Sequence, residues 1–439
     1  MTEKVDLIVV GAGPGGYEVA AKEAAKGKSV VIVEKDLPGG TCLNRGCIPT
    51  KCLCAGAGLI HNLSRASEFG VEIPDFKIDY AAAAERATKV VAELRGGVEV
   101  LLSKCRFVAG EARITPDGNV EVGDEILSSQ KIIIATGSKP ALLPIPGAEL
   151  AMTSDDFLKL VKLPERLVII GAGVIGLEFA YIASSYGVSV TVLEYCKEIL
   201  PPFDAEVAKR LRLILSSQGI NFVTSASVTA INKDGNNYIV AYADKKGEKT
   251  SEGDAVLMAV GRRAVLPEGL KEAGIEVNTR GFIVTNDNME TTRPGIYAVG
   301  DCNGKMMLAH AASAQSMYVI GEDINLNVIP SAVFTSPELA MVGLTTEQCK
   351  ANGLDYVSSK AFYRANGKAL ASGHYDGFVK VLYDPITRKM LGCHILGEGA
   401  ANLIQEATDV MANGLTIDAI TRSVHGHPTL SEIVASALS

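Results

Sequence analysis

The sequence of 439 residues contains no tryptophan, and aromatic residues make up only 5% of it. An aromatic surface that stacks single-stranded bases is therefore not expected. The 42 basic residues are outnumbered by 50 acidic ones, and the net charge of −8 disfavours a nucleic-acid backbone or an anionic membrane as the main partner. No stretch approaches the roughly 18 consecutive apolar residues that a membrane-spanning helix needs.

The first residues also lack the basic segment and the long apolar run of a secretory signal, so we expect a cytoplasmic location. Cysteines stay reduced in that compartment. The nine cysteines are therefore not expected to form a structural disulfide framework. A closely spaced cysteine pair is better explained by redox chemistry or metal binding.

Two segments share the pattern of a buried strand, a glycine-rich turn, a helix and a second buried strand that ends in glutamate. Glycines in such a turn let a pyrophosphate approach the backbone N–H groups at the start of the helix, and the carboxylate binds ribose hydroxyls. The pattern predicts two dinucleotide sites, and a turn without a ligand is the alternative. The residues are Gly11, Gly13, Gly16 and Glu34 in the first copy and Gly171, Gly173, Gly176 and Glu194 in the second.

The two glutamates also favour one form of the nicotinamide cofactor. A carboxylate at this position repels the 2′-phosphate of NADP. No arginine follows Glu194 before Arg210, although Lys197 is near in the sequence. The second copy is therefore predicted to bind NAD.

Cys42 and Cys47 lie just after the first copy. In an ideal helix their Cα atoms would be about 8.6 Å apart, whereas a disulfide tolerates at most about 6.8 Å. If the two cysteines bond, the segment cannot be a regular helix throughout, and Gly46 can supply the irregularity. A small disulfide beside a dinucleotide fold is a candidate redox centre. Two unpaired buried cysteines are the alternative, and a metal site is not expected because no histidine or second cysteine pair of metal-binding spacing lies nearby.

Residues 39–51, GGTCLNRGCIPTK, resemble the active-site signature of the flavin-dependent pyridine nucleotide–disulfide oxidoreductases. Residues 291–301, TTRPGIYAVGD, resemble the second flavin motif of that family, and the similarity extends over the whole chain. The resemblance implies an α/β fold with two Rossmann-like domains, a central domain and a C-terminal α+β dimerisation domain. The implied boundaries are 1–147 for the FAD-binding domain, 148–264 for the NAD-binding domain, 265–329 for the central domain that completes the FAD site, and 330–439 for the dimerisation domain.

The same resemblance assigns roles to individual residues. Cys42 would exchange with the substrate, and Cys47 would face the flavin. Lys51 would lie near the flavin N5 and pair with Glu178, and Asp301 would hold the ribityl chain. Further cofactor contacts are implied at Thr41, Ala135, Thr136, Gly137, Gly261, Arg262, Gly300, Ala309 and His310.

His427 is followed five residues later by Glu432. A carboxylate that fixes the tautomer of an imidazole and stabilises its protonated form makes the histidine a general base. A histidine considered in isolation is more often an ordinary hydrogen-bonded residue. However, residues 425–432, HGHPTLSE, match the base motif of the family, whose homodimers place this segment against the disulfide of the partner subunit.

The form of that motif, and residues 366–370 and 376–381, resemble the dihydrolipoamide dehydrogenase branch. That branch oxidises a dihydrolipoyl group and reduces NAD. The lipoyl-carrying protein would be a separate chain of a 2-oxo acid dehydrogenase complex or of the glycine cleavage system. A reductase of another disulfide and a flavin-bearing interaction protein are the alternatives.

Two departures from the family pattern concern loops near the cofactors. Ala264-Val265 stands where Pro-Asn is frequent, and Gln315-Ser316 stands where Glu-Gly is common. We expect them to affect local loops and not the disulfide chemistry. Cys52 and Cys54 follow the redox pair on a predicted helix and are interpreted as packing residues, and exchange of either one with the redox disulfide is the alternative.

Overall fold

The computed structural model describes residues 2–439, which form two compact units. Unit 1 comprises the chain up to Cys52, Ala81–Ala141 and Gly261–Leu326. Unit 2 comprises Leu53–Tyr80, Leu142–Val260 and Asn327–Ser439. The predicted division into four domains stays a prediction.

The main sheet of unit 1 is parallel throughout, in the order β18-β8-β2-β3-β4. Its three central strands are buried along almost their whole length, as is usual for parallel strands covered on both faces. The buried strands predicted around the first glycine-rich turn are therefore confirmed. The strands are β2 (Leu7–Val10), β3 (Val30–Glu34), β4 (Arg106–Ala109), β8 (Ile132–Ile134) and β18 (Ile296–Ala298).

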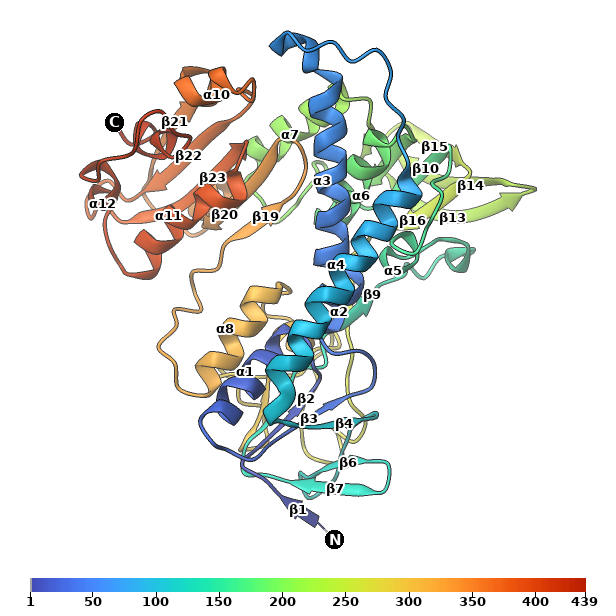
Figure 1. Cartoon of the computed structure of the whole chain (residues 1–439), viewed down its shortest axis with the longest axis vertical. Helices are drawn as coiled ribbons and strands as arrows, with labels where there is room; N and C mark the ends of the chain where they lie inside the picture. Colours follow the sequence, from blue (N-terminus) through green and yellow to red (C-terminus); the bar gives the residue numbers. More distant parts are fainter. Residues whose placement is uncertain (1) are drawn as a thin grey trace. The chain divides into compact units, whose positions relative to one another are not determined.

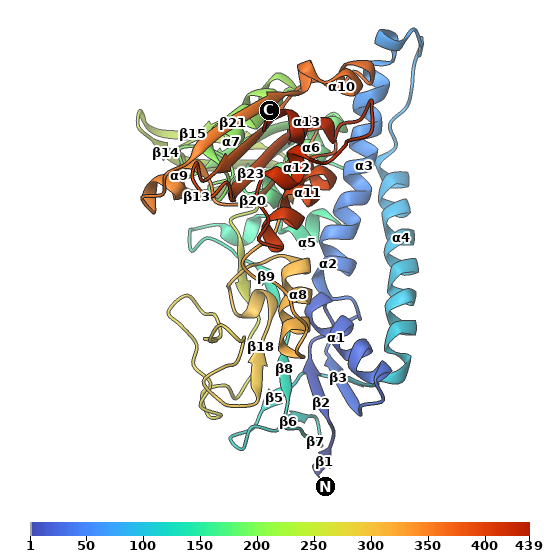
Figure 2. The ribbon, with the colours of Figure 1, turned by 90° about the vertical axis from the view of Figure 1, so that its left-hand side faces the viewer.

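Helices α1 (Pro14–Ala25) and α8 (Ala309–Val319) lie side by side in unit 1 (Figures 1 and 2). A Cβ atom added to Gly15 would stand 3.1 Å from the Cβ of Ala312, and one added to Gly300 would stand 2.8 Å from it. Small residues therefore permit this close approach, which brings the start of α8 near the first glycine-rich turn.

Two smaller sheets complete unit 1. One is mixed, in the order β1-β7-β6-β5. The other is an antiparallel ribbon of β9 and β17, which joins the segment after β8 to the segment that starts at Gly261. These strands are β1 (Thr2–Lys4), β5 (Arg113–Ile114), β6 (Val120–Val122), β7 (Glu125–Ser128), β9 (Ser138–Pro140) and β17 (Arg262–Ala264).

Unit 2 contains a second parallel sheet, in the order β12-β11-β10-β16, which confirms the second predicted copy. Helix α6 connects β10 to β11, and an antiparallel sheet of β13, β14 and β15 precedes β16. These elements are α6 (Val174–Ser185), β10 (Arg166–Ile170), β11 (Ser189–Glu194), β12 (Asn221–Thr224), β13 (Ser227–Asp234), β14 (Asn237–Asp244), β15 (Gly247–Gly253) and β16 (Ala255–Met258).

The C-terminal part of unit 2 is a five-stranded antiparallel sheet, in the order β19-β20-β23-β22-β21. Helix α11 packs along β20 and β23 (Figure 2), so this part has the predicted α+β character. The elements are β19 (Ser331–Val333), β20 (Glu338–Gly343), β21 (Val357–Phe362), β22 (Phe378–Tyr383), β23 (Met390–Gly397) and α11 (Ala400–Ala412).

The residue pattern near the C-terminus predicts a helix from Thr429 to the end of the chain, but the observed helix is shorter at both ends. The helical segment there is α13 (Glu432–Ser436). Thr429 lies outside it because its backbone N–H donates to the Glu432 side chain at 2.8 Å and its hydroxyl bonds with that of Ser431 at 2.8 Å. These local bonds compete with helix formation.

A buried ion pair joins the N-terminus of α7 (Ala205–Ser217) to β22 within unit 2. The Lys380 ammonium donates to both carboxylate oxygens of Asp204 at 2.9 Å, and neither residue is more than 3% exposed. Burial favours a raised pKa for Asp204, but hydrogen bonds from Lys380 and Thr346 outweigh it and hold the pKa below its ordinary value. The pair therefore stays ionised and links the two elements.

Within residues 2–439, no helix combines the length and the apolar composition required to span a bilayer.

Candidate active site

The first glycine-rich turn can be built only from glycine at two of its positions. Gly11 has φ +107°, and a Cβ atom on it would stand 2.4 Å from the Ala135 carbonyl oxygen. A Cβ on Gly16 would stand 1.9 Å from the Gly11 carbonyl oxygen. Gly13 precedes α1 without a side-chain cap, so the start of the helix is open to an anionic group.

Glu34 ends β3 and points toward this turn. One of its carboxylate oxygens accepts the Ala12 N–H at 2.7 Å, and the other accepts the Asp36 N–H at 2.9 Å. Two backbone donors thus fix the carboxylate and leave lone pairs on both oxygens. Those lone pairs can accept ribose hydroxyls, so the residues present fit a dinucleotide.

The second turn repeats this geometry in unit 2. A Cβ on Gly176 would stand 2.1 Å from the Gly171 carbonyl oxygen, whereas one on Gly173 would meet no heavy atom within 4 Å. The oxygens of Glu194 accept the N–H groups of Ala172 at 2.6 Å and Cys196 at 2.7 Å. Glu194 is only 7% exposed. The two predicted dinucleotide sites therefore have the same glycine-rich turn, and in each a glutamate carboxylate is held by two backbone N–H groups.

The redox segment is helical on both sides of one interruption. Helix α2 (Gly40–Arg45) ends at Gly46, and α3 (Cys47–Ser64) begins after it. A Cβ on Gly46 would stand 2.9 Å from the Thr41 carbonyl oxygen, so the two turns meet closely there. The irregularity predicted at Gly46 is confirmed.

The break brings the side chains of Cys42 and Cys47 within hydrogen-bonding distance of each other. The pKa of Cys42 is raised, chiefly by its hydrogen bond with the Cys47 side chain and next by burial, while the positive charge of Lys51 opposes the shift. A charge on one sulfur disfavours a charge on its neighbour. The pair therefore resists the loss of both protons.

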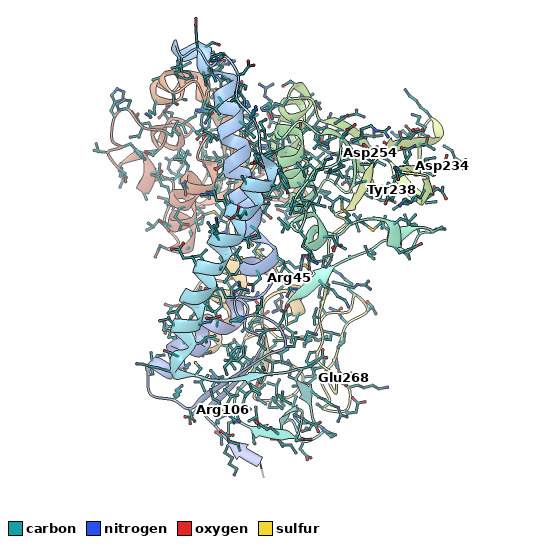
Figure 3. All side chains as sticks on the ribbon, turned by 45° about the vertical axis from the view of Figure 1, so that its right-hand side comes forward. Arg45, Arg106, Asp234, Tyr238, Asp254 and Glu268 are labelled. Carbon is teal, nitrogen blue, oxygen red and sulfur yellow. The ribbon has the colours of Figure 1, made fainter. Side chains whose placement is uncertain are left out.

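Polar contacts within unit 1 tie the redox segment to the loop after β3. The Asn44 side-chain amide donates to the carbonyl oxygens of Pro38 and Gly40, each at 3.0 Å. Arg45, labelled in Figure 3 at the end of α2, forms an ion pair with Asp36. Asp36 also donates its N–H to the Glu34 carboxylate. Asp36 therefore connects helix α2, through Arg45, to the carboxylate predicted to bind a ribose.

Asp301 follows β18 and lies against the β9–β17 ribbon. The Ser138 hydroxyl donates to the Asp301 carboxylate, and Arg262 donates to the Ser138 hydroxyl at 2.7 Å. The Arg262 guanidinium is 3.9 Å from the same carboxylate. Three predicted cofactor-binding segments therefore meet inside unit 1. They contain Thr136–Gly137, Gly261–Arg262 and Gly300–Asp301.

The Ala264-Val265 departure leaves this ribbon intact. Val265 donates its N–H to the Gly137 carbonyl oxygen at 2.9 Å, and its own carbonyl oxygen accepts the Thr136 hydroxyl at 2.6 Å. Because Val265 contributes main-chain groups to both bonds, the identity of its side chain does not decide them.

Gln315 performs a role that sequence reasoning missed. Its side-chain oxygen accepts the Gly300 N–H at 2.8 Å and the Asn303 amide at 2.9 Å, and Gln315 is 5% exposed. A neutral amide thus holds the turn that carries Asp301. The departure from the family pattern was the only sequence signal, and the partners could not be identified from it.

The cofactor contacts predicted for Thr41, Ala309, His310 and Lys51 stay predictions. Thr41 lies in α2, and Ala309 and His310 begin α8, whose N-terminus has no side-chain cap. Lys51 belongs to unit 1 and Glu178 to unit 2, so their pairing stays a prediction. Glu178 is 3% exposed and accepts the Phe334 N–H at 3.1 Å.

The structure brings His427 and Glu432 together as predicted. His427 Nδ1 lies 2.9 Å from one Glu432 oxygen, and the Thr429 N–H donates to the other. These two bonds, the Thr429 bond first, lower the pKa of Glu432. An ionised carboxylate only accepts, so Nδ1 carries the proton and Nε2 is left as a proton acceptor. The His427 side chain is 79% exposed, which leaves that nitrogen accessible.

Two further contacts hold the loop that carries His427, and sequence reasoning did not identify either. The Asn366 amide donates to the Thr429 carbonyl oxygen at 3.0 Å. His425 Nε2 lies 2.8 Å from a Glu406 oxygen. In the sequence, Asn366 was recognisable only as the first residue of the segment 366–370, and no sequence feature pointed to Glu406.

Known families and proteins match the chain over nearly its whole length. Residues 5–316 match the pyridine nucleotide-disulphide oxidoreductase family, and residues 329–438 match the dimerisation domain of that family. The dihydrolipoyl dehydrogenase of Chlamydia pneumoniae is 39% identical over 449 residues, covering 99% of this chain and 96% of that protein. That of Bacillus subtilis is 35% identical over 468 residues, covering 100% and 98%.

A solved structure is similar as well. The HOCl-induced flavoprotein disulfide reductase RclA from Escherichia coli, in a Cu(II) complex, has a TM-score of 0.87 and 29% identity, and the match covers 99% of each chain. Together with the two aimed carboxylates and the paired cysteines, these matches establish that the chain belongs to the pyridine nucleotide–disulphide oxidoreductase family.

Proposed function

We propose that this protein is a dihydrolipoyl dehydrogenase, which oxidises a protein-bound dihydrolipoyl group to its disulfide and reduces NAD. The cofactors of the family are FAD and NAD. The observation that carries the proposal is the bond between His427 and Glu432, because it leaves an exposed imidazole nitrogen able to take a thiol proton. Full-length similarity to dihydrolipoyl dehydrogenases supports the same reaction.

The chain's own residues perform the thiol chemistry. In the oxidised enzyme Cys42 and Cys47 form a disulfide. His427 Nε2 takes the proton of one substrate thiol, and the thiolate attacks the Cys42 sulfur, so that Cys47 leaves as a thiolate. The second substrate thiol then attacks the substrate sulfur bound to Cys42, which releases cyclic lipoamide, and its proton passes to the departing Cys42 sulfur. Glu432 stabilises the positive charge on His427 while it holds the proton.

Bound FAD would supply the two-electron redox chemistry that links the reduced cysteines to the nicotinamide. Gly11, Gly13 and Gly16 would leave room for its pyrophosphate, and Glu34 would accept its ribose hydroxyls. Asp301, held by Ser138, would accept hydroxyls of the ribityl chain. The second turn, with Glu194, would bind NAD and repel the 2′-phosphate of NADP.

The assembly and the partner follow from this reaction. We propose a homodimer formed through residues 329–438, with His427 of one protomer facing the cysteines of the other. The electron donor would be a separate lipoyl-carrying protein, belonging to a 2-oxo acid dehydrogenase complex or the glycine cleavage system, and the location would be cytoplasmic. The observations supporting the dimer are the matched dimerisation domain and the exposed base.

A substrate panel tests the proposal. Purified protein reconstituted with FAD is assayed with dihydrolipoamide and NAD, with dihydrolipoamide and NADP, and with glutathione disulfide and either reduced nicotinamide. We expect the fastest reaction with dihydrolipoamide and NAD. Faster reduction of glutathione disulfide, or no turnover of dihydrolipoamide, would replace the proposal by that of a reductase of another disulfide.

The role of the base is tested with two variants. His427→Ala should lower kcat/KM for dihydrolipoamide by about 100-fold to 10,000-fold. Glu432→Gln should lower it less, because the imidazole remains. NADH oxidation with an artificial electron acceptor is the control and should be largely retained. Equal losses in both reactions would show that His427 acts on the fold and not on the thiol.

A further inference from the structure

The loop that carries His427 turns only one side chain inward along residues 421–428. The other seven residues of this stretch are exposed, and Val424 is completely so. The side chain of His425 is 12% exposed. Within residues 421–428, His425 is therefore the one side chain that is largely covered, and it lies two residues before the base.

The partner of this anchor lies on a well-packed helix. His425 Nε2 is 2.8 Å from a carboxylate oxygen of Glu406, which belongs to α11. Ile404 and Ala407, its neighbours on that helix, are at most 2% exposed, and α11 packs along β20 and β23. A carboxylate at this position is therefore a fixed point for the loop.

A second contact holds the loop on the other side of the base. The Asn366 amide donates to the Thr429 carbonyl oxygen at 3.0 Å, and Thr429 in turn donates its N–H to Glu432. Asn366 is 7% exposed and also caps the helix Gly367–Ala371. Only Gly426, His427 and Pro428 lie between the two held residues, so His427 has little freedom while both contacts persist.

We propose that Glu406 and His425 form a positioning pair, which keeps the His427 imidazole in its bond with Glu432 and aimed outward at the substrate thiol. The inference rests on the proposed function for its kinetic consequences. His425 is also close enough to Glu432 to contribute to the lowering of that carboxyl's pKa, after the larger contributions of Thr429 and His427. Loss of the pair would release residues 421–428 from α11 and let the His427 imidazole move. A displacement of a catalytic group by about 1 Å can lower the rate about 100-fold.

Kinetics provide the first test. His425→Ala and Glu406→Ala should each lower kcat/KM for dihydrolipoamide by about 10-fold to 100-fold, while NADH oxidation with an artificial acceptor is unchanged. Glu406→Gln keeps an acceptor oxygen and should recover most of the activity. His374→Ala is the matched control, because His374 and Glu398 form another imidazole–carboxylate contact of unit 2, at 3.7 Å, which includes neither Glu406 nor a residue of 421–428.

A second measurement needs no substrate. The chain has six histidines, so selective labelling of imidazole nitrogen gives a simple NMR spectrum, which His427→Gln assigns. The Nδ1 proton of His427 should exchange more slowly in the unchanged protein and in His374→Ala than in His425→Ala and Glu406→Ala. If Glu406→Ala fails to fold, Glu406→Asp, which shortens the side chain, replaces it in both measurements.

The outcomes separate the two claims. A chain that shows the exchange effect but does not oxidise dihydrolipoamide would refute the proposed function and keep the positioning pair. A chain that oxidises dihydrolipoamide, with kinetics and proton exchange unchanged in both alanine variants, would overturn the positioning pair.

Discussion

Replacing Glu194 by alanine should weaken NAD and narrow the preference for NAD over NADP. Both Glu194 oxygens are held by backbone N–H groups, at 2.6 Å and 2.7 Å, so the carboxylate is aimed before any cofactor binds. Glu194 is only 7% exposed, and the low local dielectric strengthens the interaction of its carboxylate with a neighbouring charge or hydroxyl. Its effect on selectivity should therefore be large for one side chain.

The size of the effect follows from the bonds lost. A hydrogen bond to a charged group contributes about 1.5 to 3 kcal/mol. Losing about 2 kcal/mol of ribose binding lowers kcat/KM for NADH about 30-fold. NADP loses the same ribose bonds only in part and is relieved of repulsion from the carboxylate, so its kcat/KM should stay the same or rise. The ratio of the two values should fall by at least about 30-fold.

The assay is steady-state oxidation of NADH and of NADPH with an artificial electron acceptor, which does not require the lipoyl substrate. Glu198→Ala is the matched control. Glu198 is a carboxylate four residues further along whose partner is Arg212, at 2.6 Å, and it is not bonded to the turn. If Glu194→Ala keeps the ratio of the unchanged enzyme, or if Glu198→Ala lowers it equally, the aimed carboxylate is not the selector.

Three further changes test other parts of the site and fold. In a reductive titration with two electrons, Cys42→Ser should keep a long-wavelength absorbance band from a thiolate next to the flavin, and Cys47→Ser should lose it. The reverse result would mean that Cys42 faces the flavin and Cys47 exchanges with the substrate. Gln315→Glu should lower the flavin reduction potential by tens of millivolts, because it adds a buried negative charge beside the turn that carries Asp301. Roughly 30 mV corresponds to about 1.4 kcal/mol. An unchanged potential in a dye-equilibration titration would contradict this expectation. Burial lowers the pKa of His394 from 6.5 to about 4. As the pH falls, the unfolded chain therefore binds this proton before the folded chain does, and the free energy of unfolding should decrease by up to about 3 kcal/mol between pH 6.5 and pH 4. Urea midpoints should depend less on pH in His394→Leu, and an unchanged dependence would exclude His394 as the cause.

The sequence by itself predicts the parts of the site whose chemistry is local. Gly11 and Gly16 are required by contacts within one strand–turn–helix segment, and Glu34 and Glu194 end the strands that follow such turns. The break at Gly46 follows if Cys42 and Cys47 form a disulfide, because a regular helix would hold cysteines five residues apart too far from each other. His427 and Glu432 are close enough in sequence for one turn to join them. In each case the partners are separated by few residues, so backbone geometry limits the possible arrangements.

Tertiary structure decided the contacts that hold these groups in place. Ser138 reaches Asp301 across 163 residues, and Asn366 reaches Thr429 across 63. Which distant polar groups meet depends on how sheets and helices pack, and many pairings would satisfy the same sequence pattern. The helix predicted from Thr429 illustrates the limit, because the apolar pattern favours helix while the Glu432 carboxylate binds the Thr429 N–H and His427. A buried polar group must find a partner, but only the packed chain determines that Glu406 serves this role for His425.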